Sequence, residues 1–144
     1  DERNIKVLEK HGVLSRRELA SRYEIYKHAY ETIVQLEGSC ALTMGHTQII
    51  PAGLTFQKEL AETIKIVGTA GKTIAAKKLL KEVSGLTEDI LNTLDSLETA
   101  LSKHDPAKIN AGMVKLRSSV DALEGLVPEH LWPLPSYAEM LLMN

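Results

Sequence analysis

The chain has 144 residues, of which 44% are hydrophobic and 25% charged, and its formal charge is −2. Lys and Arg are spread among acidic residues, which argues against a sequence-independent nucleic-acid binder, whose affinity rests on neutralising phosphates. No apolar run approaches the roughly 20 residues of a membrane helix, and the start shows no signal peptide. We therefore expect a single domain over residues 1–144, with neither a nucleic-acid nor a membrane partner.

The first predicted elements are a short helix and a long one. Gly12 is typical of the end of a helix over residues 4–11, and Ser15 with Glu18 forms a capping box that begins the next helix. Apolar residues then recur at spacings of four and three, so they share one helix face that needs a partner. This stripe contains Leu19, Tyr23, Tyr26, Tyr30, Ile33, Leu36 and Cys40. We expect its tyrosines to pack in the core, with each hydroxyl near the rim.

Pro51 divides the long helical segment. Its ring clashes with the preceding turn and its nitrogen carries no hydrogen, so a kink or a new helix is predicted there. The helical pattern resumes up to Gly68, which makes residues 16–67 a bent spine. Further helices are predicted over residues 72–83, from Thr87 to about residue 101, and over residues 106–127. Gly85 is expected to end the first of these, and Asp105 to cap the last.

The overall pattern favours an all-α protein. No sustained period-two alternation or hairpin signal supports a strand. Spacings that average 3.5 residues favour shallow helix crossings, and short loops make neighbouring helices antiparallel. The predicted architecture is an antiparallel up-and-down helical bundle with a long kinked helix and a C-terminal strap.

The strap contains the only tryptophan of the chain, within the stretch "LWPLPSYAEML" at residues 131–141. Its two prolines fix φ and restrict the preceding residue, which favours an extended segment of low entropy. Such a segment can bury its large apolar side chains against the bundle or against neighbouring protein. The docking residues predicted here are Trp132, Pro133, Leu134, Pro135 and Tyr137. Ser136 and Glu139 are expected to form a second capping box that starts a final helical turn.

Residues that commonly carry chemistry do not form a convincing site in this sequence. "GTAGKT" at residues 68–73 is similar to a phosphate-binding loop, but Ile66 stands where that motif needs its first glycine. We interpret it as a turn between helices. No two of the five histidines have the spacing that places two metal ligands on one helix face. The single cysteine, Cys40, allows no internal disulfide and fits a reducing cytoplasm. No catalytic, cofactor-binding or metal-binding residue is therefore predicted.

Two longer stretches resemble a known family. "LSRRELASRYEIYKHAYETI" at residues 14–33 and "VDALEGLVPEHLWPLPSYAEMLL" at residues 120–142 are similar to the C-terminal region of type III glutamine synthetases. An "IIPA" element at residues 49–52 lies between them and also looks like the family. Residues 35–42, "QLEGSCAL", depart from the uninterrupted helix that the family tends to show there.

The resemblance implies a helical, non-catalytic C-terminal fragment of a longer enzyme. That enzyme would join ammonia to glutamate with ATP and a divalent metal, in the cytoplasm, as a ring-shaped homo-oligomer. The cofactors would bind its catalytic domain, which would be the partner of this fragment. A stand-alone adaptor that binds a partner helix is the alternative, and a regulatory ligand-binding module is a third possibility.

Overall fold

The computed structural model describes residues 1–69, 71–135 and 137–142, and this part of the chain consists of helices joined by turns, with no strand. The elements are α1 (Glu2–Lys10), α2 (Arg16–Met44), the π-helical turn η1 (Gly45–Ile49), α3 (Ile50–Val67), α4 (Ile74–Ser102), α5 (Pro106–Glu124), the 3₁₀ turn η2 (Glu129–Leu131) and α6 (Tyr137–Leu142). The predicted all-α class is confirmed.

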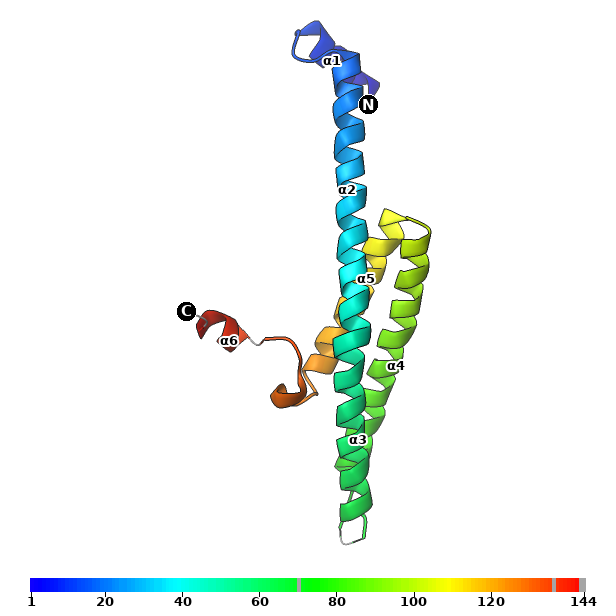
Figure 1. The fold of residues 1–144 in the computed structure, drawn as a ribbon, viewed down its shortest axis with the longest axis vertical. Helices are drawn as coiled ribbons and strands as arrows, with labels where there is room; N and C mark the ends of the chain where they lie inside the picture. Colours follow the sequence, from blue (N-terminus) through cyan, green and yellow to red (C-terminus); the bar gives the residue numbers. More distant parts are fainter. Residues whose placement is uncertain (70, 136, 143–144) are drawn as a thin grey trace.

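The helices form a long rod with a shorter hairpin packed along one part of it (Figure 1). α2, η1 and α3 follow one another as the spine. α4 turns back along α3, and α5 returns against α4 and crosses the spine. The N-terminal part of α2 extends beyond the hairpin and carries α1 at its end, whereas α6 lies to one side of the bundle (Figure 1).

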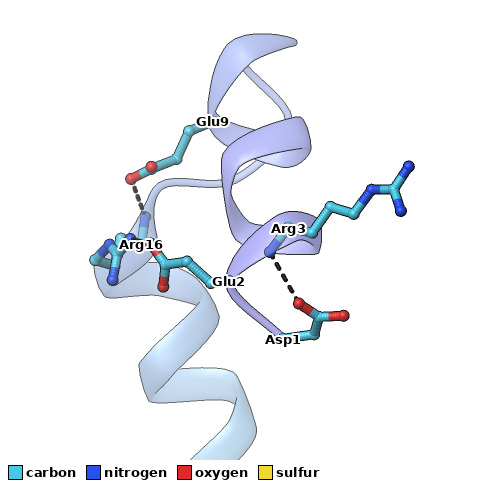
Figure 2. Close-up of polar contacts among 5 residues, drawn as sticks. All are labelled: Asp1, Glu2, Arg3, Glu9 and Arg16. Atoms are coloured by element: carbon cyan, nitrogen blue, oxygen red, sulfur yellow. Dashed lines mark hydrogen bonds and ion pairs between the residues drawn. The ribbon is translucent and has the colours of Figure 1, made fainter.

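The start of α2 is held by the predicted capping box. The Glu18 backbone N–H donates to Ser15 Oγ at 3.3 Å, and the Ser15 N–H donates to Glu18 Oε2 at 2.8 Å. Arg16 also ties α1 to α2, because its N–H donates to Glu9 Oε1 at 2.9 Å and its guanidinium pairs with Glu2 (Figure 2). Between the two helices, Gly12 has a φ of +63°, a conformation that glycine adopts without the steric cost of a Cβ.

This capping box makes the stability of α2 sensitive to acid. Hydrogen bonds from the Ser15 amide and hydroxyl hold the pKa of Glu18 below its ordinary value of 4.5. A lowered folded-state pKa gives a stabilisation that is complete above the unfolded-state value and is lost as the pH falls through the folded-state value. We expect Glu18→Gln to lose less thermal stability than the unmodified protein between about pH 6 and about pH 3. Glu24→Gln, which removes a charge elsewhere on α2, is the control. An equal loss in all three proteins would contradict the prediction.

The spine continues through the predicted break at Pro51. The π turn η1 ends two residues before this proline, which is the second residue of α3. A wider turn at this point relieves the clash between the proline ring and the carbonyl group four residues earlier. Figure 1 shows α2, η1 and α3 running in one direction in its view. A new helical element at residue 50 is therefore present, whereas the predicted kink is not confirmed.

The prediction of a helix end at Gly85 was wrong. α4 runs without a break from Ile74 to Ser102, and Thr87 lies inside it instead of capping a new helix. The Thr87 hydroxyl donates to the Val83 carbonyl oxygen at 2.7 Å and accepts from Gln57 Nε2 at 2.9 Å, which also links α4 to α3. Packing of the buried α4 face outweighs the cost of one glycine, about 1 kcal/mol. α5 ends at Glu124 instead of residue 127, with its predicted Asp105 cap in place.

The core lies between the hairpin and the lower half of the spine. Every fully buried large side chain among the described residues belongs to α4 or α5, and the spine adds Val34, Ile49, Phe56 and Leu60. Three glycines let the spine come close to the hairpin. A Cβ atom at Gly38, Gly45 or Gly53 would lie within 2.5–2.8 Å of a side-chain atom of Ile109, Leu94 or Thr87 respectively.

The π turn keeps these three glycines on one face of the spine. Gly38 and Gly45 are seven residues apart, close to two helical turns, but Gly45 and Gly53 are eight apart. Eight residues of regular α-helix would rotate Gly53 about 80° beyond Gly45. The π turn takes up the extra residue, and the close approach continues along the whole interface.

Candidate docking surfaces

The predicted docking residues lie on two separate parts of the molecule. The tyrosines belong to the part of α2 that projects beyond the hairpin, which we call the arm (residues 16–33). The strap, residues 132–135, follows α5 and lies beside the bundle on the way to α6 (Figure 1). The structure therefore does not bring the two predicted groups together.

The tyrosines of the arm are not in the core, so the prediction that they pack there was wrong. Tyr23, Tyr26 and Tyr30 are 65%, 70% and 52% exposed, and Ile33 on the same stripe is 54% exposed. The part of α2 with Tyr23 and Tyr26 extends beyond the hairpin (Figure 1). Ile33 is exposed although its neighbour Val34 is buried, so the stripe lies on a side of α2 that the hairpin does not cover. We call Tyr23, Tyr26, Tyr30 and Ile33 the tyrosine stripe.

One tyrosine of the stripe is linked to the hairpin. The Tyr30 hydroxyl accepts a hydrogen bond of 2.8 Å from Asn110 Nδ2, on the first turns of α5. That hydroxyl lies at the rim of the bundle, as predicted, although its ring is exposed. Below this level, Val34 and Gly38 are buried against the hairpin. The stripe itself continues into Leu36, which is 70% exposed, so it lies beside the packed face of the spine and not in line with it.

The strap does contact the bundle. Trp132 and Leu134 are partly buried and pack against the hydrophobic core, whereas Pro133 and Pro135 are exposed. Trp132 has extended backbone angles, φ −80° and ψ 123°, as expected for a residue before proline. Tyr137 is the first residue of α6, and the second predicted capping box involves Ser136, which lies outside the described residues.

The indole N–H of Trp132 lacks a hydrogen-bond acceptor in the part of the chain that the structure describes. Its Nε1 atom is buried and has no hydrogen-bond acceptor among the described residues. A buried donor without an acceptor costs about 1–3 kcal/mol. The ring therefore fills an apolar space but does not satisfy its own N–H within this part of the chain.

A groove that sequence reasoning missed runs beside the strap. It measures about 470 Å³ and is bounded by the spine, α5 and the tail, with Met44, Met113 and Met140 among its lining residues. Its spine wall includes Ala41, Gly45 and Ile49. The one sequence signal for such a groove is the spacing of Ala41 and Gly45, which are four positions apart. Small side chains on one face of a helix leave space beside that helix.

No cluster suited to metal or phosphate chemistry occurs among the described residues. No group of three or more His, Cys, Asp or Glu side chains there is placed to hold a metal ion. His28 and His104 border a shallow surface cavity together with Glu31 and Gln35. Residues 68–73 lie in the turn between α3 and α4, of which Ala70 is outside the described residues. None of the described helices is long and apolar enough to span a bilayer.

Known proteins resemble this chain over most of its length. It is 27% identical to the type-3 glutamine synthetase of Dictyostelium discoideum over 99% of this chain. It is 26% identical to a glutamine synthetase of Butyrivibrio fibrisolvens over 96% of this chain, and 23% identical to one of Bacteroides fragilis over 98%. In each case the chain covers 22% of the relative. No solved structure matches it significantly.

The N-terminal half carries the family signal. Residues 1–67, which comprise α1 and the whole spine, match the family model of the glutamine synthetase C-terminal domain. The resemblance to the C-terminal region of type III glutamine synthetases, first recognised in residues 14–33 and 120–142, is thereby confirmed. The spine of this chain, with the α1 helix before it, thus matches the glutamine synthetase C-terminal domain, and nearly the whole chain is similar to a type-3 glutamine synthetase.

Proposed function

We propose that the chain is a non-catalytic helical domain of a type-3-like glutamine synthetase and that it supports the stability or assembly of that enzyme. The parent reaction would be the ATP-dependent ligation of ammonia to glutamate in the cytoplasm. ATP and the divalent metal would bind a catalytic domain of the same chain. The chain covers 22% of its relatives, which leaves room in such proteins for a separate catalytic part.

The observation that carries this proposal is the exposed tyrosine stripe. Four large side chains on one side of the arm are more than half exposed, and Leu36, the next residue of the same stripe, is 70% exposed. Contiguous exposed apolar surface of this kind marks a contact site with other protein. Tyrosine suits such a site, because its ring buries a large area while its hydroxyl stays near the rim.

Deletion in the parent enzyme tests the assembly role. Removing the segment that corresponds to residues 1–144 is expected to lower the oligomer mass measured by light scattering, or to lower the melting temperature of the enzyme. Tyr23→Ser with Tyr26→Ser should reproduce the loss without unfolding the domain, since both side chains are exposed. Ser21→Ala with Lys27→Ala on the same arm is the control. An intact, fully active oligomer after the deletion would refute the proposal.

A stand-alone adaptor is the second candidate function, and the groove beside the strap favours it. A groove lined by methionines accepts an apolar helix face readily, because methionine side chains adapt their shape. The reading frame upstream of Asp1 discriminates the two functions: a catalytic domain encoded there supports the first. Isothermal titration with nucleotides and glutamine tests the third possibility, a regulatory ligand.

A further inference from the structure

We propose that the outer face of α4 pairs with the same face of a second copy of this chain, in an antiparallel arrangement about a two-fold axis. The inference rests on the assembly role proposed above and assigns a surface to it. Three observations carry it: an unpartnered helix face, a charge pattern that is complementary to itself, and a glycine whose position nothing within the chain explains.

The unpartnered face lies opposite the core. Val83, Ile90, Leu94 and Leu97 form the buried face of α4. Residues two positions away from these lie about 200° around the helix, on its far side. Six exposed residues there repeat at alternating spacings of three and four, and we call them the outer stripe: Lys78, Lys81, Gly85, Glu88, Asn92 and Asp95. A seven-residue repeat keeps these positions in one line along the helix. Helix seams with this spacing are usually apolar, whereas the outer stripe is polar, so pairing along it would depend on charge.

The charges of the outer stripe divide into two halves. Its N-terminal half is basic, with Lys78 and Lys81, and its C-terminal half is acidic, with Glu88 and Asp95. None of these four residues forms an ion pair within the part of the chain that the structure describes. The segments around them have the same division: residues 63–81 contain five lysines and no acid, whereas residues 82–105 contain six acids and one lysine.

An antiparallel second copy matches this pattern. The spacings of the outer stripe read the same in both directions, so a two-fold axis at its centre superposes the stripe on itself. Lys78 of each copy then faces Asp95 of the other, and Lys81 faces Asn92 with Glu88 one turn away. A parallel pair would place lysine against lysine and acid against acid, which is unfavourable. The charges therefore favour the antiparallel orientation.

Gly85 lies next to the proposed axis. It is exposed in the interior of a 29-residue helix, where glycine is about 1 kcal/mol less favourable than alanine. A Cβ atom at this position would have no neighbour within 4 Å, unlike one at Gly38, Gly45 or Gly53. Intrachain packing thus does not require glycine here. Close approach of a second helix does, because Gly85 of one copy would face Glu88 of the other.

Sedimentation equilibrium of the 144-residue chain at low salt tests the pairing. We expect the mean mass to rise from 15.9 kDa towards twice that value between about 1 µM and about 1 mM protein. Raising the salt concentration from about 50 mM to about 500 mM should weaken the association, because exposed charges are screened. A chain that stays monomeric at low salt over this whole range overturns the inference, and the outer stripe would then be a solvated face or would meet another acidic and basic surface.

Charge reversal identifies the surface. Lys78→Glu with Lys81→Glu should raise the dimer dissociation constant at least about tenfold, since attractive pairs become repulsive. Adding Glu88→Lys and Asp95→Lys restores complementarity and should return the constant to within about threefold of the original. Lys65→Glu with Lys72→Glu changes the charge equally outside the stripe and serves as the control. Equal weakening by this control, or no recovery in the fourfold variant, would contradict the proposal.

The outcomes for this surface and for the proposed function are separable. Far-UV circular dichroism of each variant confirms that it is folded, as expected for exposed substitutions. Loss of assembly on deletion in the parent, combined with a monomeric isolated chain, would remove the α4 pairing and leave the proposed function standing. If instead the isolated chain dimerises and the deletion leaves the assembly and stability of the parent unaffected, the α4 pairing would stand and the proposed function would fall.

Discussion

Replacing Gly45 with leucine is expected to lower the free energy of unfolding by about 3 kcal/mol, the upper end of the usual cost of overpacking a core. A Cβ atom alone at this position would lie 2.5 Å from Leu94 Cδ2 and 3.0 Å from Leu94 Cδ1. Leu94 is completely buried, so it cannot move aside without displacing its neighbours. Chemical denaturation monitored by circular dichroism measures the loss of stability. A variant that fails to fold supports the same conclusion.

Gly85→Ala is the matched control for this substitution. It replaces a helical glycine too, but the added Cβ atom meets nothing within 4 Å. At low protein concentration we expect it to stabilise the chain by about 1 kcal/mol, the difference in helix propensity. Similar effects of the two substitutions would show that the spine and the hairpin do not approach as closely as described.

Trp132→Ala is expected to destabilise the isolated chain by about 2–3 kcal/mol. This is less than the 3–5 kcal/mol typical of a fully buried aromatic residue, because the indole is only partly buried. The lost contacts are those with the hydrophobic core, next to Leu131 and Leu134. The melting temperature should fall by about 6–12 °C for a chain of this size. No fall would mean that the strap contributes nothing to the bundle and serves another surface.

Trp132→Phe tests the contribution of the indole N–H group separately from that of the ring contacts. The Nε1 donor is buried without an acceptor among the described residues, so its removal relieves part of the penalty while most of the apolar contact remains. We expect a change of less than about 1 kcal/mol in the isolated chain. In the parent enzyme, a much larger loss with phenylalanine than in the isolated chain would show that a neighbouring part supplies the missing acceptor.

The α4 pairing and the tyrosine stripe would give the chain two contact surfaces. The tyrosine stripe is apolar and suits permanent contact, whereas the outer stripe is charged and its contact should depend on salt. They lie on different elements, the arm and the hairpin, so one can be altered without the other (Figure 1). Combining Tyr23→Ser with Lys78→Glu in the parent enzyme would show whether their effects are independent.

Local signals in the sequence were reliable where neighbouring residues decide the structure. The capping box at Ser15, the turn at Gly12 and the Asp105 cap before Pro106 are all present. Each depends on hydrogen bonds or backbone angles within a few residues, which the sequence contains in full. The absence of strand signals likewise led to the correct all-α class.

Signals that depend on partners were less reliable. Gly85 suggested a helix end, yet the buried face of α4 continues the helix through it. The tyrosine stripe has the spacing of a core face, yet the hairpin does not cover it. A periodic pattern shows that a face needs a partner but does not show whether that partner belongs to the same chain.

The sequence by itself determined the all-α class, most helix ends and the likeness to type III glutamine synthetases, because these follow from local hydrogen bonding and from residue identity. Only the tertiary structure decided that the spine passes through a π turn, that three glycines allow the hairpin to approach, and that the arm stays uncovered. These features depend on the relative lengths of helices and on contacts between residues far apart in the chain, which no local pattern contains.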